Sequence, residues 1–157
     1  MEMDMLNEGE AKEIEILEFK AGGNSYGISV NEIREILAYN MKPTPVPNAH
    51  AFIEGIIMPR DFIITILDFN KCFNLNADDE FKNEMIINTR FGDLNIALHV
   101  DSVNGIHKQN EAAIHYYDSE EEHSEFTTGF ILNGDKKLEL VDYIKLFQSI
   151  NSDIDLA

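Results

Sequence analysis

Apolar residues in the middle of the chain form two strand-length runs that flank a polar pair. The runs are Ile53–Met58 and Phe62–Phe69, and Arg60 and Asp61 lie between them. β-branched and aromatic residues dominate both runs, which is typical of two paired strands with a short connection. Pro59 cannot donate a backbone hydrogen bond to a sheet and therefore belongs at a strand end. The pattern predicts a central hairpin with Arg60 at its tip.

Three further hairpins are predicted where apolar, strand-like runs flank a turn signal. The clearest turn is Asn133-Gly134-Asp135. The predicted strand pairs are Glu13–Lys20 with Ser25–Ser29, Glu84–Thr89 with Leu94–Val100, and Thr127–Leu132 with Lys137–Val141. Because the strands come in hairpins and do not alternate with helices, the pattern favours small antiparallel barrels or a sandwich.

Three segments are predicted to be helical. In Val30–Leu37 the apolar residues recur at helical spacing, with Ser29 as the N-cap. Asn70–Phe73 has the composition of a single helical turn. The last is Tyr143–Ile150, which has one apolar face and Asp142 as its cap. The sequence therefore predicts a mainly β protein with two or three short helices.

Length and charge limit the functional classes. The 157 residues, 44% of them hydrophobic, suffice for one domain or for two small subdomains that share a core. We expect an acidic, flexible N-terminus at 1–12, the folded domain at 13–150 and a polar tail or truncated linker at 151–157. A net charge of -17 argues against binding to nucleic acid or to an anionic membrane. With no signal peptide and no apolar run of membrane-spanning length, a cytoplasmic protein is predicted.

Residue patterns that carry catalysis are missing from the sequence. It has no glycine-rich phosphate loop, no paired zinc cysteines and no HExxH motif. The densest group of candidate metal ligands is His115 to His123, but a run of acids is more typical of a solvated loop. His99 lies in an apolar strand and is interpreted as a half-buried, hydrogen-bonded histidine. We therefore predict a binding module that is not an enzyme, with no cofactor and no metal.

Four segments, in the same order, resemble the CheW-like domains of bacterial chemotaxis. EFKAGGNSYGISVNEIREIL resembles the opening hairpin and helix of the family, and PTPVPNAHAFIEGIIMPRDFIITILDF resembles its "TPLP…GVINLRGxxxPVxDL" signature. ALHVDSVNGI resembles its "VDxV" strand, and TTGFILNGDKKLELVDYIKL resembles its closing segment. The resemblance covers the chain from Glu13 to Ile150.

The resemblance implies a fold of two intertwined, five-stranded, SH3-like antiparallel barrels. It also implies a non-catalytic scaffold that links methyl-accepting chemoreceptors to the histidine kinase CheA. In the family, a groove between the barrels receives the cytoplasmic tip of the receptor, and barrel ends pair with the regulatory domain of the kinase. The resemblance also allows weak self-association through the barrel ends, and recruitment from the cytoplasm to membrane receptor arrays.

The family also suggests binding residues. Ile33 and Glu35 match positions implicated in receptor contact, and Arg60 matches the arginine of "NLRG". Asp61 replaces the glycine of that motif, and we expect it to hold Arg60 locally and to change which partner Arg60 meets. Glu54 completes the candidates, and pairing of Arg60 with Glu54 or Asp61 would make the arginine structural.

Three alternatives remain open at the level of sequence. The chain could be the isolated coupling domain of a CheV-type protein, whose receiver domain is absent. It could be a metal-dependent hydrolase or sensor that uses the His115–His123 loop, or a barrel-type interaction module outside chemotaxis.

Overall fold

The computed structural model describes residues 12–76 and 83–151. Apart from Lys12 and Asn151, the expected N-terminal segment and C-terminal tail lie outside these residues. The strands are β1 (Glu13–Ala21), β2 (Asn24–Ser29), β3 (Ile33–Ala38), β4 (Ile53–Ile57), β5 (Ile64–Asp68), β6 (Met85–Phe91), β7 (Leu94–Val100), β8 (Ser102–Asn110), β9 (His115–Tyr116), β10 (Thr127–Asn133) and β11 (Lys136–Val141). The α-helices are α2 (Phe69–Cys72) and α3 (Tyr143–Asn151), and short 3-10 turns span Val30–Glu32 and Glu111–Ala113.

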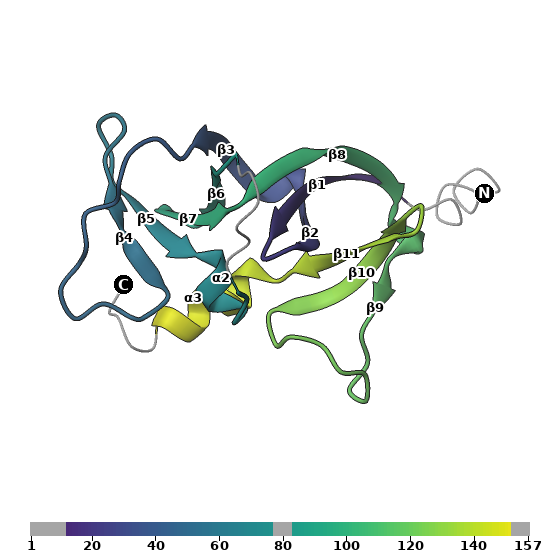
Figure 1. Ribbon diagram of the computed structural model, residues 1–157. Helices are drawn as coiled ribbons and strands as arrows, with labels where there is room; N and C mark the ends of the chain where they lie inside the picture. Colours follow the sequence, from purple (N-terminus) through teal and green to yellow (C-terminus); the bar gives the residue numbers. More distant parts are fainter. Residues whose placement is uncertain (1–11, 77–82, 152–157) are drawn as a thin grey trace.

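The strands form two sheets that lie side by side (Figure 1). Sheet A has the order β8-β1-β2-β11-β10-β9, and sheet B has the order β3-β6-β7-β5-β4. The chain begins in sheet A, builds all of sheet B and then returns to complete sheet A. The two sheets are therefore intertwined in sequence, and the mainly β, SH3-like fold implied by the resemblance is confirmed.

Two strand pairs are parallel, which the hairpin pattern did not predict. β2 pairs with β11, and β5 pairs with β7, each in parallel. These pairs join strands from different hairpins, so local turn signals carry no information about them. Neither sheet closes through backbone hydrogen bonds within the described residues, since β3 and β4 remain the two edges of sheet B.

The predicted helix Val30–Leu37 is wrong. Only Val30–Glu32 forms a helical turn, and the Ser29 side chain makes no capping bond. The rest is β3, which pairs antiparallel with β6. Half-buried and exposed side chains alternate along β3, but polar Glu35 takes a half-buried position and apolar Ile36 an exposed one, so the apolar residues fall at a spacing that looks helical.

The other predicted elements are confirmed. The four hairpins, β1–β2, β4–β5, β6–β7 and β10–β11, are all antiparallel. Asp68 Oδ1 accepts hydrogen bonds from the backbone of Asn70 and Lys71 and so caps α2. Asp142 Oδ1 accepts from the backbone N–H of Lys145 at 3.0 Å in the first turn of α3. Capping aspartates thus fix both helices at strand ends.

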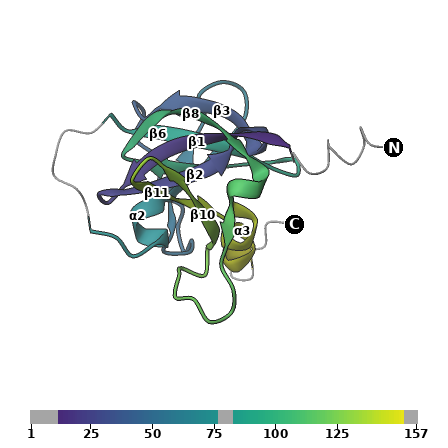
Figure 2. The same ribbon diagram turned by 90° about the vertical axis from the view of Figure 1, so that its right-hand side faces the viewer.

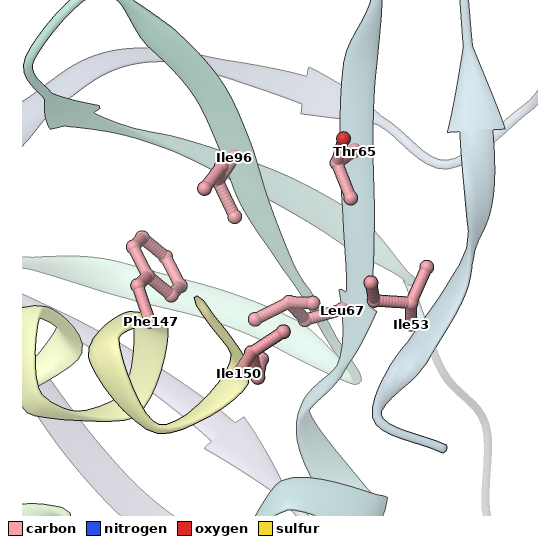
Figure 3. Close-up of a pocket in the computed structure, with 6 residues that line it drawn as sticks. All are labelled: Ile53, Thr65, Leu67, Ile96, Phe147 and Ile150. Atoms are coloured by element: carbon pink, nitrogen blue, oxygen red, sulfur yellow. The ribbon is translucent and has the colours of Figure 1, made fainter. Parts of the chain in front are cut away.

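The largest apolar cluster lies between the sheets and includes α3. Phe147 and Ile150 point from α3 toward Leu67 and Ile96 of sheet B (Figure 3). The gap that these side chains leave is only about 10 Å³. Figures 1 and 2 show α3 beside the strands at the junction of the two sheets. The last helix, which follows the last strand of sheet A, therefore covers one face of sheet B.

Two further observations bear on the sequence analysis. In the part of the chain that the structure describes, no helix is long and apolar enough to cross a membrane. Cys72, the one cysteine of the sequence, is buried at the end of α2, and burial raises the pKa of its thiol. A buried cysteine of this kind packs as a small apolar side chain.

We expect Phe147→Ala to destabilise the whole domain. The side chain is fully buried between the sheets, so its loss should lower the free energy of unfolding by about 3–5 kcal/mol. Urea denaturation followed by circular dichroism measures the change. Gln148→Ala, on the exposed side of the same helix, is the matched control and should change stability by about 0.5 kcal/mol or less. Equal effects of the two substitutions would contradict the role given to α3.

Candidate interaction surface

Arg60 and Glu35 form an ion pair at one end of sheet B. Arg60 lies in the loop between β4 and β5, and Glu35 lies on β3. Arg60 Nη2 lies 2.9 Å from both Glu35 carboxylate oxygens. The Arg60 side chain is 52% exposed and Glu35 is 26% exposed. The guanidinium also lies 4.8 Å from the centre of the Phe62 ring, so a cation–π contact helps to orient it.

The ion pair spans what we call the seam, the gap between the edge strands β3 and β4. Beneath the pair, the buried side chain of Asn88 on β6 donates to Glu35 at 3.5 Å and to Asn95 at 3.3 Å. Below this polar layer lies an apolar layer inside sheet B. It consists of Ile57, Ile64, Ile66, Ile86 and Ala97, with Leu37, Tyr39 and Phe62 packed against them.

A second polar group lies at the other end of the seam. The Tyr39 hydroxyl donates to Glu54 on β4, and His99 Nδ1 lies 2.7 Å from Glu54 Oε1. His99 Nε2 lies 2.8 Å from Glu84 Oε1, and the Tyr39 ring stacks on the imidazole with centres 3.8 Å apart. Side chains thus join the two edge strands at both ends of the seam, where backbone hydrogen bonds do not.

The electrostatics of this second group follow from its contacts. Burial opposes the charged form of His99, but the bonds to Glu54 and Glu84 outweigh it and raise the pKa of His99. Burial likewise works against ionised Glu54, yet the bonds from His99 and Tyr39 lower the pKa of its carboxyl. Burial and the bond to Glu54 raise the pKa of Tyr39. The contacts therefore favour the protonated form of a histidine that lies between two carboxylates.

Apolar side chains are exposed around the middle of the seam. One hollow of about 270 Å³ is lined by residues of both edges, Leu37 and Ala38 of β3 and Ile57 of β4. A second hollow of about 230 Å³ adjoins it, and the two share Met41 and Ile57. The exposed large apolar residues of this region are Ile36, Met41, Val46, Met58 and Ile63, which we call the seam patch. Met41, Met58 and Ile63 line the second hollow together, and exposed apolar residues that gather in this way indicate a protein-binding site.

The structure brings some of the predicted site residues together and separates others. Arg60 and Glu35 are partners, although the sequence offered Asp61 or Glu54 as partner of Arg60. That expectation is wrong, because Asp61 is exposed in the loop and Glu54 bonds Tyr39 and His99. Ile33 lies on β3, half-buried against the cluster between the sheets.

Sequence reasoning missed most of the second polar group. His99 was expected to be half-buried and hydrogen-bonded, which is confirmed, but no signal identified its partners Glu84 and Tyr39. Glu84 lies 15 residues before His99, and Tyr39 lies in the segment after β3. Only the pairing of β3, β6 and β7 brings them together. Asn88 likewise carries no local signal.

The acidic loop offers no metal site in the described residues. No group of three or more histidine, cysteine or acidic residues there could hold a metal ion. His115 Nε2 instead lies 2.8 Å from Glu121, and His123 Nδ1 lies 2.7 Å from the Ser124 carbonyl oxygen. The geometry defines the class as a protein-binding β module, in which polar residues tie strands together and the exposed apolar residues gather at an open sheet edge.

Comparison with known proteins agrees with this class. A family model for the CheW-like domain matches residues 15–151. Chemotaxis protein CheW of Thermotoga maritima is 25% identical over 139 residues, covering 88% of this chain and 91% of that protein. The CheW protein of Klebsiella aerogenes is 29% identical over 149 residues, covering 90% and 86%. The fold resembles the crystal structure of scaffolding protein TtCheW from Thermoanaerobacter tengcongensis, with a TM-score of 0.75 and 24% identity over 83% of this chain and 89% of that one.

The chain belongs to the CheW-like domain family. Proteins of this family are non-catalytic chemotaxis scaffolds that couple chemoreceptors to CheA, so the predicted class and the absence of enzymatic activity are confirmed. The matched relatives are CheW proteins and do not favour the CheV alternative.

The Arg60–Glu35 pair should contribute little to stability. Because Arg60 is half-exposed, a double-mutant cycle of Arg60→Ala and Glu35→Gln should give a coupling energy of about 0.2–1 kcal/mol. Chemical denaturation of the four proteins measures it. A coupling of several kcal/mol would instead make the pair a structural element of the fold.

Ile33 and Ile36 should differ sharply when replaced by aspartate. Ile33 packs on the core, so Ile33→Asp buries a carboxylate without a partner and should lower the free energy of unfolding by about 2 kcal/mol or more. Ile36→Asp, on an exposed position of the same strand, should cost about 0.5 kcal/mol. Thermal and urea denaturation of both variants tests the difference, and equal stabilities would show that Ile33 is not part of the core.

Proposed function

We propose that this chain couples the cytoplasmic tip of a methyl-accepting chemoreceptor to the regulatory domain of CheA, within cytoplasmic receptor arrays. The observation that carries the proposal is the half-exposed Arg60–Glu35 pair beside the seam patch. This surface combines a charged group at its rim with apolar contacts at its centre, which is the usual composition of a protein interface.

Arg60 retains donors for a partner. Both hydrogen bonds to Glu35 come from Nη2, so Nη1 and Nε of this half-exposed side chain are left to donate to a partner. A guanidinium can bind a carboxylate or carbonyl oxygens of a partner through them. Glu35 therefore orients Arg60 rather than removing it from the surface, and Asp61 adds an acidic group beside it.

The seam patch is suited to contacts with the kinase and with the receptor. Met41, Met58 and Ile63 are exposed and line one hollow beside β4, and the resemblance implies that barrel ends of the family pair with the regulatory domain of the kinase. Ile36 lies on the exposed side of β3, and an apolar strand position of this kind can pack on a receptor helix. The proposal thus assigns receptor contact to β3 and kinase contact to the loops beside it.

Binding measurements with two partners test the proposal. Isothermal titration of the purified chain against a receptor-tip fragment and, separately, against the CheA regulatory domain should give saturable binding to both. Arg60→Glu should weaken binding to one of them about tenfold, or about 1.4 kcal/mol, with the fold intact.

Lys108→Glu is the matched control for Arg60→Glu. It makes a similar change of charge at an exposed position of sheet A, so it should leave both affinities unchanged. Absence of binding to either partner by the folded wild-type protein would refute the coupling function. Equal weakening by both variants would show that net charge, and not the position of Arg60, determines binding.

A further inference from the structure

His99 is held between two carboxylates by both of its ring nitrogens. Nδ1 lies 2.7 Å from Glu54 and Nε2 lies 2.8 Å from Glu84. The imidazole is 14% exposed, whereas Glu54 and Glu84 are 23% and 39% exposed. The three residues come from β7, from β4 and from the residue just before β6, so one ring connects three parts of sheet B.

The number of protons on the His99 ring makes this arrangement sensitive to pH. An ionised carboxylate only accepts hydrogen bonds, so each ring nitrogen must donate one. A neutral imidazole carries one N–H, and only the imidazolium carries two. Loss of one proton therefore leaves a nitrogen lone pair facing a carboxylate oxygen at a distance that suits a hydrogen bond.

The charged and titratable groups around His99 come from every neighbouring element. Glu54 and Glu84 contact the ring, and Tyr39 stacks on it and donates to Glu54. Asp68 pairs with His99 across β5 and β7 and carries a further negative charge. Lys71 on α2 is the cation whose charge acts on Glu54. Three carboxylates against one lysine favour the protonated ring.

We propose that His99 is a pH-sensitive clasp for the seam of sheet B, which goes beyond the coupling function. The imidazolium joins β4 to the start of β6, and through Tyr39 it joins both to the end of β3. Deprotonation releases Glu84, because Glu84 is the more exposed carboxylate and Glu54 keeps its bond from Tyr39. The end of the seam next to Tyr39 then loosens.

The direction of the pH effect follows from the raised pKa of His99. A histidine whose pKa is higher in the folded protein stabilises the fold fully below its unfolded value of about 6.5. This contribution disappears as the pH rises through the folded pKa. The clasp is therefore closed at a pH below about 6.5 and opens as the pH rises through the raised pKa of His99.

Sheet A provides an internal contrast. His107 Nε2 lies 2.6 Å from Glu18, whose second oxygen accepts from Lys136 at 2.8 Å. His107 therefore faces one carboxylate through one nitrogen, and a neutral ring can still donate that bond. Burial opposes ionisation of Glu18, but Lys136 and His107 outweigh it and lower the pKa of Glu18. This group resembles the clasp in composition but does not require a doubly protonated ring.

Hydrogen exchange of one backbone amide reports on the clasp directly. The Tyr39 amide donates to the Glu84 carbonyl at 3.0 Å, so its protection depends on the end of the seam that His99 holds. In the full chain, NMR titration should show two ring N–H groups on His99 at low pH and a midpoint above about 6.5. Across that midpoint the protection factor of Tyr39 should fall about tenfold for each unit by which the pKa is raised.

Two variants test whether the contact between His99 and Glu84 causes the pH dependence of the Tyr39 amide protection. In Glu84→Gln the amide can donate to Nε2 of a neutral ring, so the pH dependence at Tyr39 should vanish while the protection at high pH remains. His107→Gln should keep the pH dependence of the wild type. The proposal is overturned if the protection of Tyr39 does not change across the His99 midpoint. It is also overturned if Glu84→Gln shows the same dependence as the wild type.

Discussion

Strands β3 and β4 end sheet B, and no backbone hydrogen bonds join them within the described residues. Most of the features of the candidate surface follow from this constraint. A sheet with open edges must be completed by side chains, and here a polar group closes each end of the seam over an apolar middle layer. The bridge Thr44–Ile56 covers part of the β4 edge from the linker. The remaining edge carries the exposed apolar residues that a partner would cover.

The order of the chain makes the two sheets depend on one another. Sheet B is complete after β7, but one of its faces is covered by α3, which is made only after β8 to β11 have completed sheet A. Leu67 and Ile96 would otherwise expose apolar surface, which is unfavourable in water. The cluster shared by both sheets therefore makes the domain one cooperative unit, and neither sheet is an independent subdomain in energetic terms.

The sequence predicted the elements that local chemistry determines. Turn residues and alternating apolar positions identify the four hairpins, and the cap Asp142 with one apolar face identifies α3. The segment of β3 was predicted to be a helix because Ile33, Ile36 and Leu37 fall at helical spacing, and only the pairing with β6 makes it a strand. The parallel pairs β2–β11 and β5–β7 were missed because they join segments far apart in the chain, where no turn signal exists.

The sequence analysis named several residues of the candidate site but did not predict which of them are in contact. The resemblance supplied Arg60 and Glu35 separately, yet 25 residues separate them and nothing in the sequence indicates that they meet. It also grouped Glu54 with them, whereas the structure places Glu54 at the opposite end of the seam. A side chain that ties two strands together and one that binds a partner look alike in sequence, because both are polar residues beside apolar ones.

The net charge adds a last constraint on how this surface binds. At -17 the chain repels an acidic partner at long range, but ions screen this repulsion beyond about 8 Å in physiological salt. Selectivity must then come from short-range contacts. A guanidinium oriented by Glu35 and Phe62 loses less conformational entropy on binding than a freely rotating one. Glu35 thus improves the orientation of Arg60 but partly neutralises the charge of the guanidinium. This suits a scaffold that must recognise the shape of its partners more than it must attract them from a distance.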